Sequence, residues 1–449
     1  MSERTATTAA GDTPAPTRAR LLSYGVGSVG TGIFSTVPGL LLLYYMTDTL
    51  AVPAGAAGLV VTLPKAWDAI FNPYVGAASD REAVRTGRRS RLLLVGAVLL
   101  PVTFAAMFLS PATGSGAVVW ISVAFVLAAS TFAIFQVPYV ALPTEMSPNP
   151  VVRTRIMSWR IISLTVGILV AGGLAPAVVS LGGKGRAGYA LMGLVVGAVL
   201  LVVLTVAARG TRWVVSRPGP EQLSLPAAFR AARGNRAFFA LLAAFVLQAA
   251  GTAVMLAAAP YVATYRLDDY GLTSVLFVCL VAPSAVAVPL WSKAAHRFGR
   301  LRCLLFATLG YAVGSVALLP VSAAGNVPGT LALCALLGVC YAALQLLPLS
   351  LLPDTVVADT DRTGHTQSGA FTGLWTAGET AGLALGPGAY AVGLAATGFV
   401  SSTFDHPVAQ TALARTGLLL GFSLVPAALL LASLPALFAY GRRRKESCR

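Results

Sequence analysis

A carboxylate and an amine lie close together inside an apolar segment of this sequence. Lys65, Asp68 and Asn72 are spaced at i, i+3 and i+7, so a helix would place all three on one face. An ionisable group in a membrane-spanning helix costs about 2.5 to 3.5 kcal/mol on insertion scales, and it usually faces a bundle interior or water. Asp68 is therefore a candidate for carrying a cation. The alternative is that Lys65 and Asp68 only neutralise each other.

The composition identifies the class of protein in which these residues stand. Of the 449 residues, 56% are hydrophobic and only 11% are charged, whereas a soluble protein carries about 25% charged residues. The chain is therefore predicted to cross a lipid bilayer several times. Its formal net charge is +16, but the basic residues fall in short clusters between apolar runs. That distribution favours orientation in a membrane over nucleic-acid binding, so no nucleic-acid partner is predicted.

The apolar runs are long enough to span hydrocarbon, which takes about 20 residues in a helix. They predict an all-α polytopic membrane protein with two six-helix halves, at residues 21–208 and 237–440. A link at 209–236 joins the halves, and a disordered tail at 1–20 and a basic tail at 441–449 flank them. The twelve predicted spans are 21–47, 54–79, 92–110, 117–143, 155–181, 187–208, 237–264, 271–292, 303–322, 329–353, 367–400 and 411–440.

The distribution of Lys and Arg predicts the orientation of these spans. Basic clusters follow the second, sixth, eighth and last predicted spans, while the alternate loops carry few basic residues. Because basic loops stay cytoplasmic, both tails and the link are predicted to be cytoplasmic. The five cysteines show no paired or metal-binding spacing, so we interpret them as small apolar residues and predict no metal site.

A weak repeat relates the two predicted halves. Gly87-Arg88 after the second span matches Gly299-Arg300 after the eighth, and Leu142-Pro143 matches Leu352-Pro353. The two offsets, about 212 and about 210 residues, fit two consecutive halves of similar length. Parallel repeats with a substrate site at their interface are typical of major-facilitator transporters.

Four segments of the chain agree with one branch of that superfamily in both order and spacing. They are 41–48, 67–73 with 79–81 and 87–89, 137–143 with 153–155, and 352–361 with 368–370. They resemble, respectively, the end of helix 1, the helix 2 signature, and the helix 4 to 5 and helix 10 to 11 connections of the glycoside-pentoside-hexuronide:cation symporters, the family of melibiose permease. This resemblance implies the major-facilitator fold and cation-coupled transport of a small molecule.

The resemblance also implies a cation site near the second helix, but this chain departs from the family there. Sugar-transporting members use an acid, an amide, a second acid and a helix 4 hydroxyl, at positions that match Asp68, Phe71, Asn72 and Ala133 here. Sodium prefers several hard oxygen ligands, so these residues favour H+ over Na+ as the coupling ion. A lone carboxylate can carry a proton, because burial favours its neutral form. We predict that Asp68, Asn72 and Glu379 take part in proton coupling.

The implied substrate site departs from the family as well. Acids that hold sugar hydroxyls in galactoside-binding members are replaced by Gly32 and Gln136, so a disaccharide is not expected. Arg160 matches a family arginine near the substrate, and Glu379 stands where the family has a lysine; the two could attract each other in one conformation and separate in another. The predicted substrate-binding residues are Tyr24, Lys65, Gln136, Arg160, Gln345 and Trp375. The alternatives are packing between helices, or for Arg160 a buried stem with its guanidinium at the membrane interface.

The charged turn after the second predicted span is a separate candidate for the mechanism. Asp80, Arg81, Gly87 and Arg88 are predicted to form a conformational latch. In it, Asp80 binds a helix N-terminus or an arginine in one conformation and releases it in another. The alternative is that this turn only sets the topology, for which the arginines alone are sufficient.

These observations predict a monomeric secondary transporter of the cytoplasmic membrane that couples H+ to a small solute, glycoside-like or more apolar. One alternative is an H+ antiporter that exports a hydrophobic or glycosylated metabolite, since the same cycle runs in either direction. Another is a receptor that keeps the transporter fold without transport. An enzyme is not predicted, because the three histidines are far apart and no catalytic cluster, metal-binding spacing or cofactor motif occurs.

Overall fold

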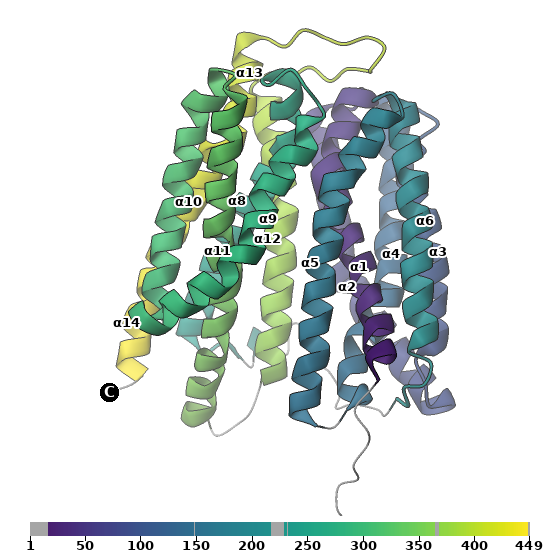
Figure 1. Cartoon of the computed structure of the whole chain (residues 1–449), viewed down its shortest axis with the longest axis vertical. Helices are drawn as coiled ribbons and strands as arrows, with labels where there is room; N and C mark the ends of the chain where they lie inside the picture. The colour runs from purple at the N-terminus through teal and green to yellow at the C-terminus, as the bar shows by residue number, and fades with distance from the viewer. Residues whose placement is uncertain (1–16, 148, 217–228, 231, 364–367, 448–449) are drawn as a thin grey trace, which may run out of the picture.

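The computed structural model describes residues 17–147, 149–216, 229–230, 232–363 and 368–447, which fold into long helices running along one common direction (Figure 1). Nearly all of the predicted N-terminal tail, the centre of the link and the last residues of the basic tail lie outside the described residues. The helices are α1 Arg18–Val37, η1 Pro38–Leu42, η2 Tyr45–Thr49, α2 Ala54–Thr86, α3 Ser90–Phe108, α4 Gly114–Met146, α5 Pro150–Leu181, α6 Arg186–Gly210, α8 Arg236–Tyr265, α9 Leu272–Phe298, α10 Arg300–Ala323, α11 Val327–Thr363, α12 Ser368–Ala396, α13 Ala412–Phe422 and α14 Leu424–Ser447.

The prediction of an all-helical polytopic membrane protein is confirmed. Within the described residues, ten helices are long and apolar enough to cross a membrane, with α13 and α14 forming one of these spans. The two predicted spans that do not meet this criterion correspond to α2 and α12. Helix α2 carries Lys65 and Asp68, and α12 carries Glu379 and several glycines, and such residues lower the mean hydropathy of the two helices. The charged residues that suggest function are thus among those that keep α2 and α12 below the criterion for a membrane span.

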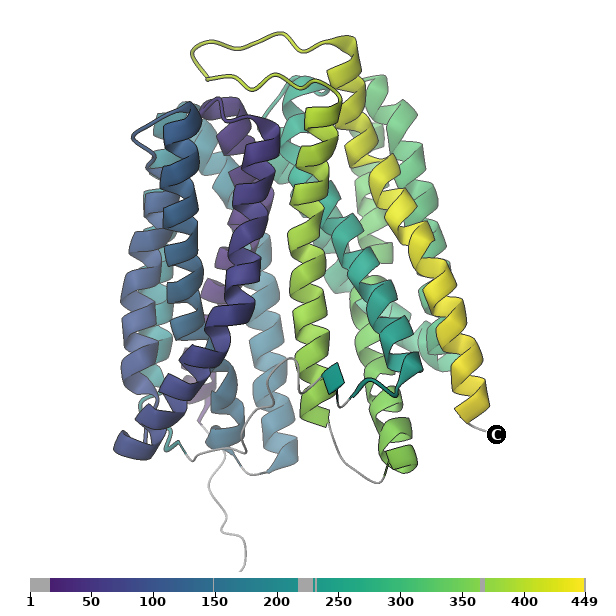
Figure 2. The ribbon, with the colours of Figure 1, turned by 180° about the vertical axis from the view of Figure 1, so that it is seen from behind.

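The helices form two bundles that stand side by side (Figures 1 and 2). Helices α1–α6 make the N bundle, and α8–α14 make the C bundle. The bundles touch where α2 packs on α12, and small residues allow the contact: a Cβ on Gly58 would lie 2.5 Å from the Cβ of Ala391, and one on Gly388 would lie 2.6 Å from Oγ1 of Thr62. Close backbone approach at small residues is the usual way in which membrane helices associate.

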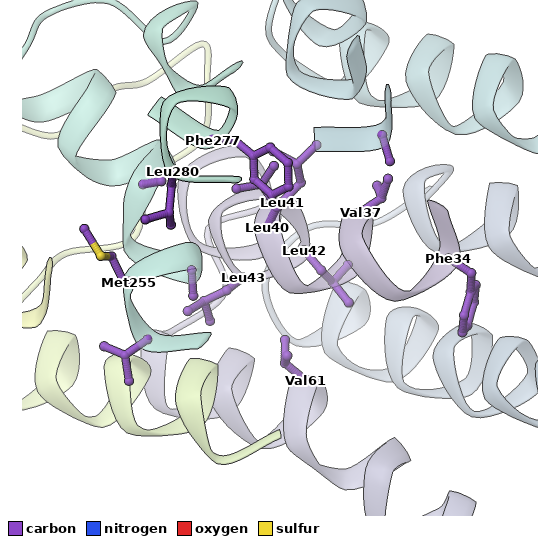
Figure 3. Packing of buried hydrophobic residues seen from close by; sticks show 14 of the residues in the cluster. Phe34, Val37, Leu40, Leu41, Leu42, Leu43, Val61, Met255, Phe277 and Leu280 are labelled. Carbon is purple, nitrogen blue, oxygen red and sulfur yellow. The ribbon is translucent and has the colours of Figure 1, made fainter. Parts of the chain in front are cut away.

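A buried apolar cluster continues from one bundle into the other. Leu40 to Leu43, at the end of η1, meet Met255 of α8 and Phe277 and Leu280 of α9 (Figure 3). Phe277 also packs over Gly172 of α5, where an added Cβ would lie 2.1 Å from the ring. The contact between the bundles in this region is therefore apolar and closely packed.

Each bundle contains the same turn between two helices, which supports the sequence repeat. Gly87 ends α2 with φ of 65° and Gly299 separates α9 from α10 with φ of 92°, a region that favours glycine. In both bundles an arginine just after this glycine pairs with a carboxylate that lies shortly after a Leu-Pro pair. The two ion pairs are Arg89–Glu145 and Arg300–Asp354, each at 2.9 Å.

Two π-helical turns carry the chain from α1 to the end of the molecule opposite the C-terminus. We call this the distal end, and the end where the C-terminus lies the terminal end (Figure 1). Pro38 cannot donate a backbone hydrogen bond, and at the end of η2 the N–H of Leu50 reaches back five residues to the carbonyl of Tyr45, at 3.2 Å. These wide turns place Tyr44, Thr47 and Asp48 against the C bundle.

Hydrogen bonds join the two bundles at the distal end. Backbone bonds of 2.9 Å link Ala51 N–H to the Ser402 carbonyl and Ser402 N–H to the Thr47 carbonyl. Side-chain bonds join Tyr44 to Thr264, Thr47 to Tyr261, Asp48 to Tyr265, and Tyr189 to Tyr270. We call these eight side chains the distal gate, which is closed in this structure.

Candidate functional site

Two stacked tyrosines organise the inner side of the N bundle. The rings of Tyr24 on α1 and Tyr139 on α4 lie 4.6 Å apart, and both side chains are fully buried. The Tyr139 hydroxyl lies 2.7 Å from Oγ of Ser28 and 2.5 Å from the Tyr24 carbonyl oxygen. Tyr139 is therefore fully satisfied within the protein and holds α1 and α4 together.

The neighbouring polar groups are not satisfied in the same way. Arg160 of α5 lies close enough to Tyr24 and Tyr139 to interact with both electrostatically. Gln136 precedes Tyr139 by three residues on α4, so the two share a helix face. Among the described residues, no partner bonds the Tyr24 hydroxyl, Oε1 of Gln136 or Nε of Arg160, although these atoms are buried. Leaving such an atom unpaired costs about 1 to 3 kcal/mol, so the three atoms are suited to a polar ligand or water.

The α2 residues lie on a helix that packs on both α12 and α4. Asp68 and Lys65 are both partly buried and interact electrostatically, but they form no ion pair in the part of the chain described here. Asn72 is exposed. Phe71, which stands at the amide position of the family site, stacks on Trp67 with ring centroids 5.6 Å apart. Since Phe71 and Ala133 bring no side-chain oxygen, these positions provide few ligands for sodium.

The C bundle contributes a smaller polar cluster. Gln345 of α11 is exposed and donates to the Tyr341 hydroxyl at 2.8 Å, and Glu379 of α12 lies within electrostatic reach of that tyrosine. Trp375, one turn before Glu379, stacks on Phe245 at 4.4 Å and leaves its buried Nε1 without a partner among the described residues. Within that same part of the chain, Glu379 forms no ion pair with Arg160 in this conformation.

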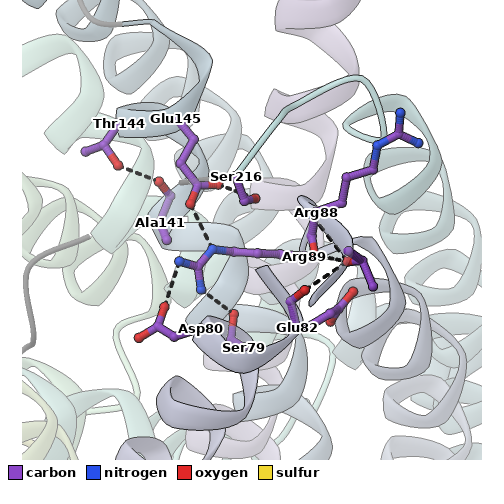
Figure 4. A network of polar contacts seen from close by, with 10 residues as sticks. Ser79, Asp80, Glu82, Arg88, Arg89, Ala141, Thr144, Glu145 and Ser216 are labelled. Atoms are coloured by element: carbon purple, nitrogen blue, oxygen red, sulfur yellow. Dashed lines mark hydrogen bonds and ion pairs between the residues drawn. The ribbon is translucent and has the colours of Figure 1, made fainter. Parts of the chain in front are cut away.

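The charged turn after α2 forms a network centred on an arginine that the sequence did not single out. Arg89 is 6% exposed and pairs with Asp80 at 2.7 Å and with Glu145 at 2.9 Å, and its Nη1 donates to Ser79 at 2.6 Å (Figure 4). Ser216, after α6, donates to the other oxygen of Glu145 at 2.7 Å. Burial opposes the charge of Arg89, but its bonds to Glu145 and Asp80 outweigh burial and raise its pKa above the ordinary value.

The other predicted latch residues have different positions. Arg81 and Arg88 are exposed and form no ion pair with any described residue. Gly87 ends α2, and its carbonyl accepts a 2.9 Å bond from the N–H of Ser216, which ties the start of the link to this turn. A role as a latch therefore fits Asp80 with Arg89 and Glu145. Arg89 was visible in the Gly87-Arg88-Arg89 motif, whereas nothing local marked Glu145 or Ser216.

Taken together, the predicted residues of α1, α2, α4 and α5 include phenolic, cationic and amide side chains as well as Asp68, and those of α11 and α12 include the acid Glu379. Two such sets of side chains can bind a polar solute between two bundles that move relative to each other. Within the described residues, no group of three or more His, Cys, Asp or Glu side chains is placed to hold a metal ion.

Comparison with known proteins identifies the family and the fold that this chain resembles. Residues 23–441 match the family described as MFS/sugar transport protein. The symporter sll1374 of Synechocystis, itself uncharacterized, is 34% identical over 171 residues, which are 34% of this chain and only 31% of that protein. A glucuronide carrier protein homolog of Escherichia coli is 24% identical, with 86% of this chain and 85% of the relative covered. Among solved structures, an inward-facing, unoccupied bacterial homolog of the human lysosomal transporter Spinster matches with a TM-score of 0.72 at 15% identity, over 96% of this chain and 99% of that one.

Proposed function

The chain belongs to the MFS/sugar transport protein family, which consists of transporters and not enzymes, and on this premise we propose that it couples the movement of a small organic solute to H+ by alternating access. The proposal includes twelve spans in two six-helix halves, with α2 and α12 crossing the membrane beside the other ten. Both termini face the cytoplasm, and the protein acts as a monomer in the cytoplasmic membrane. The basic clusters at the terminal end support this orientation.

The observation that carries the substrate site is the set of buried polar atoms left open by Tyr24, Gln136 and Arg160. They come from three different helices of one bundle, and Trp375 of the C bundle adds a fourth. A solute with hydroxyl or anionic groups would bond Arg160 and Gln136, and its apolar face would pack on the aromatic rings. A glycoside-like molecule or an amphiphilic metabolite has this chemistry.

Asp68 is the proposed proton carrier. It is a partly buried acid within the predicted second span, and the family cation-site positions Phe71 and Ala133 bring no side-chain oxygen for a metal cation. Movement of α2 relative to α12 would change the exposure of Asp68 and with it the affinity for a proton. Asn72 and Glu379 are its proposed partners in this step.

Export by H+ antiport is the second candidate function, and experiment must decide the direction of transport. The same site serves an importer or an H+ antiporter, because the gradients set the direction of an alternating-access cycle. The acids that hold sugar hydroxyls in galactoside-binding members are replaced here, which favours a more apolar cargo and therefore keeps export as an alternative.

The test measures flux of labelled glycosides, sugars and amphiphilic metabolites in sealed vesicles under an imposed pH or sodium gradient. We expect flux driven by the pH gradient, and loss of that flux in Asp68→Asn, since the amide cannot bind and release a proton. Asp405→Asn is the matched control, because Asp405 is an exposed carboxylate of the distal loop, and it should transport like the wild type.

Flux that follows a sodium gradient, or proton-driven flux that persists in Asp68→Asn, would contradict the coupling assignment and direct attention to Glu379. Uptake and efflux under opposite pH gradients distinguish cotransport from antiport. Saturable binding of a solute without any flux would support the receptor alternative.

A further inference from the structure

Asp48 is a partly buried carboxylate of the distal gate that the proposed transport cycle does not use. It lies at the end of η2, outside the membrane-spanning helices. Its carboxylate accepts a hydrogen bond from the hydroxyl of Tyr265, which belongs to the other bundle. The contact between Asp48 and Tyr265 therefore exists only while the gate is closed.

The groups that face Asp48 are phenols. Within the described residues no lysine, arginine or histidine forms an ion pair with it. Arg266, next to Tyr265, directs its guanidinium to the carbonyl of Arg415 instead, and Asp269 bonds the backbone of Gly271. The titratable side chains close enough to interact with Asp48 are Tyr44 on its own segment, Tyr189 of α6, Tyr261 and Tyr265 of α8, and Tyr270 before α9.

The hydroxyl groups around Asp48 are neutral and provide no positive charge to balance an ionised carboxylate. Tyr265 donates to Oδ1 of Asp48. The Tyr44 hydroxyl also interacts with Asp48 and lies 3.0 Å from Oγ1 of Thr264. At this partly buried position, desolvation without a cationic partner favours the neutral form of a carboxyl group.

We propose that Asp48 is a second proton-binding site of this protein, which holds a proton while the distal gate is closed and releases it when the gate opens. The inference rests on the proposed alternating-access cycle. When the bundles separate at the distal end, Tyr265 leaves with the C bundle and water replaces it beside Asp48. The O–H bond of the carboxyl then breaks and the proton passes to water on the distal side; it returns by the same route before closure.

The sign of the pH dependence follows from the closed structure. Burial raises the pKa of Asp48 above its ordinary value, and the bonds from Tyr265 and Tyr44 offset burial only in part. An open gate returns the carboxyl to water, where its pKa is about 3.9. Closure is therefore favoured at low pH, and it weakens as the pH rises towards and through the raised pKa of the closed gate.

The experiment measures the opening of the gate and requires no substrate. Spin labels are placed at Leu181, at the end of α5, and Ala324, after α10, both exposed at the distal end, in a variant whose five cysteines are replaced by alanine. Distance distributions are recorded in lipid nanodiscs between pH 4 and pH 9, for otherwise unchanged protein, Asp48→Asn, Tyr265→Phe and Asp405→Asn.

In the protein with Asp48, we expect the population with the longer distance between labels to grow as the pH rises. Because closure binds one proton, the ratio of open to closed molecules should rise by up to about tenfold per pH unit. Asp48→Asn should stay closed throughout, because its amide oxygen accepts from Tyr265 and the group does not titrate. Tyr265→Phe should open more readily at every pH yet keep the pH response, and Asp405→Asn should behave like the unchanged protein.

The inference would be overturned if the distance distribution of the protein with Asp48 did not change with pH, or if Asp48→Asn showed an equal pH response. The pH response of the spin-labelled protein with Asp48 is by itself a test of the inference, even where a variant is unstable. The distance measurement is independent of flux, so failure of this inference can be distinguished from failure of the proposed function. A gate that does not respond to pH in a protein that transports would reject only the Asp48 site. A gate that responds to pH in a protein without flux would reject only the proposed transport.

Discussion

The polar residues of the helices differ in whether their atoms find a partner within the protein. Trp67 donates to Ser130 at 2.8 Å, and Gln345 donates to Tyr341 at the same distance, so these side chains have a partner within the protein. The Tyr24 hydroxyl and Nε of Arg160 are buried and have none among the described residues. Buried polar atoms are normally satisfied, and exceptions occur at functional sites. Such atoms also occur elsewhere in the described residues, for example at Ser315 and Tyr390, so the substrate candidates depend on the closeness of Arg160 to Tyr24 as well as on their open atoms.

Replacement of Arg160 by lysine tests this at the scale of one residue. Lysine keeps the positive charge but loses the planar group and Nε, so we expect weaker substrate binding with little change in folding. The loss of one charge-assisted hydrogen bond, about 1.5 to 3 kcal/mol, corresponds to a rise in KM of roughly tenfold to a hundredfold. The measurement is the concentration dependence of flux in vesicles.

Arg155→Lys provides the matched control, because Arg155 is an exposed arginine near the start of the same helix. Its KM should equal that of the wild type. An unchanged KM in Arg160→Lys would show that Arg160 only anchors α5 at the membrane interface.

At the scale of the elements, glycines determine how closely α1 and α5 approach. A Cβ on Gly32 would lie 2.6 Å from the carbonyl oxygen of Leu164, and a Cβ on Gly167 would lie 2.3 Å from that of Val29. These atoms belong to the backbone and cannot move aside as a flexible side chain can. The crossing therefore fixes the separation of the two helices that carry Tyr24 and Arg160.

Gly167→Ala should accordingly destabilise the protein and disturb the site. Inserting a methyl group into a packed contact costs about 1 to 3 kcal/mol, so we expect a lower Tm of the detergent-solubilised protein together with a raised KM. Gly393→Ala in α12 is the control, since a Cβ added there would meet nothing within 4 Å. That change should be neutral or stabilise the helix by about 0.5 to 1 kcal/mol; equal Tm values for the two variants would exclude the close crossing.

At the scale of the whole molecule, the described bonds between the bundles gather at the distal end. Tyr44, Thr47 and Asp48 bond to α8, and the backbone of residues 47–51 bonds to Ser402. The latch network of Asp80, Arg89 and Glu145, in contrast, lies within the N bundle. The structure thus represents the conformation closed at the distal end, and opening must break the distal bonds as a group.

The proposed orientation predicts which end an impermeant reagent can reach. In a variant without the native cysteines, Asp405→Cys at the distal end should react with a membrane-impermeant maleimide in intact cells. Arg88→Cys, exposed after α2, should react only after the membrane is opened. The positive-inside rule is the physical reason. The reverse pattern would place the termini outside and exchange the two sides of the cycle.

Much of the fold and part of the site follow from the sequence. Ten of the spans were predictable because hydropathy is summed along a contiguous segment. The predicted spans at 54–79 and 367–400 correspond to the helices α2 and α12, which do not meet the membrane criterion within the described residues. Tyr24, Gln136, Arg160 and Trp375 were predicted as substrate-binding residues, a role that the flux measurements are to test. The prediction of Arg81 and Arg88 in the latch did not anticipate Arg89, because the adjacent arginines 88 and 89 look alike in the sequence until the direction of each side chain is known.

The sequence by itself determined that this protein is a helical membrane transporter of two related halves, because apolar length, charge clusters and short motifs are local properties of the chain. Only the tertiary structure decided which groups meet. Arg89 and Glu145 are 56 residues apart, and Asp48 and Tyr265 are 217 apart. Pairs so distant depend on the packing of whole helices, on glycine crossings and on wide turns such as η2. The partner of each buried polar group is therefore a property of the folded molecule.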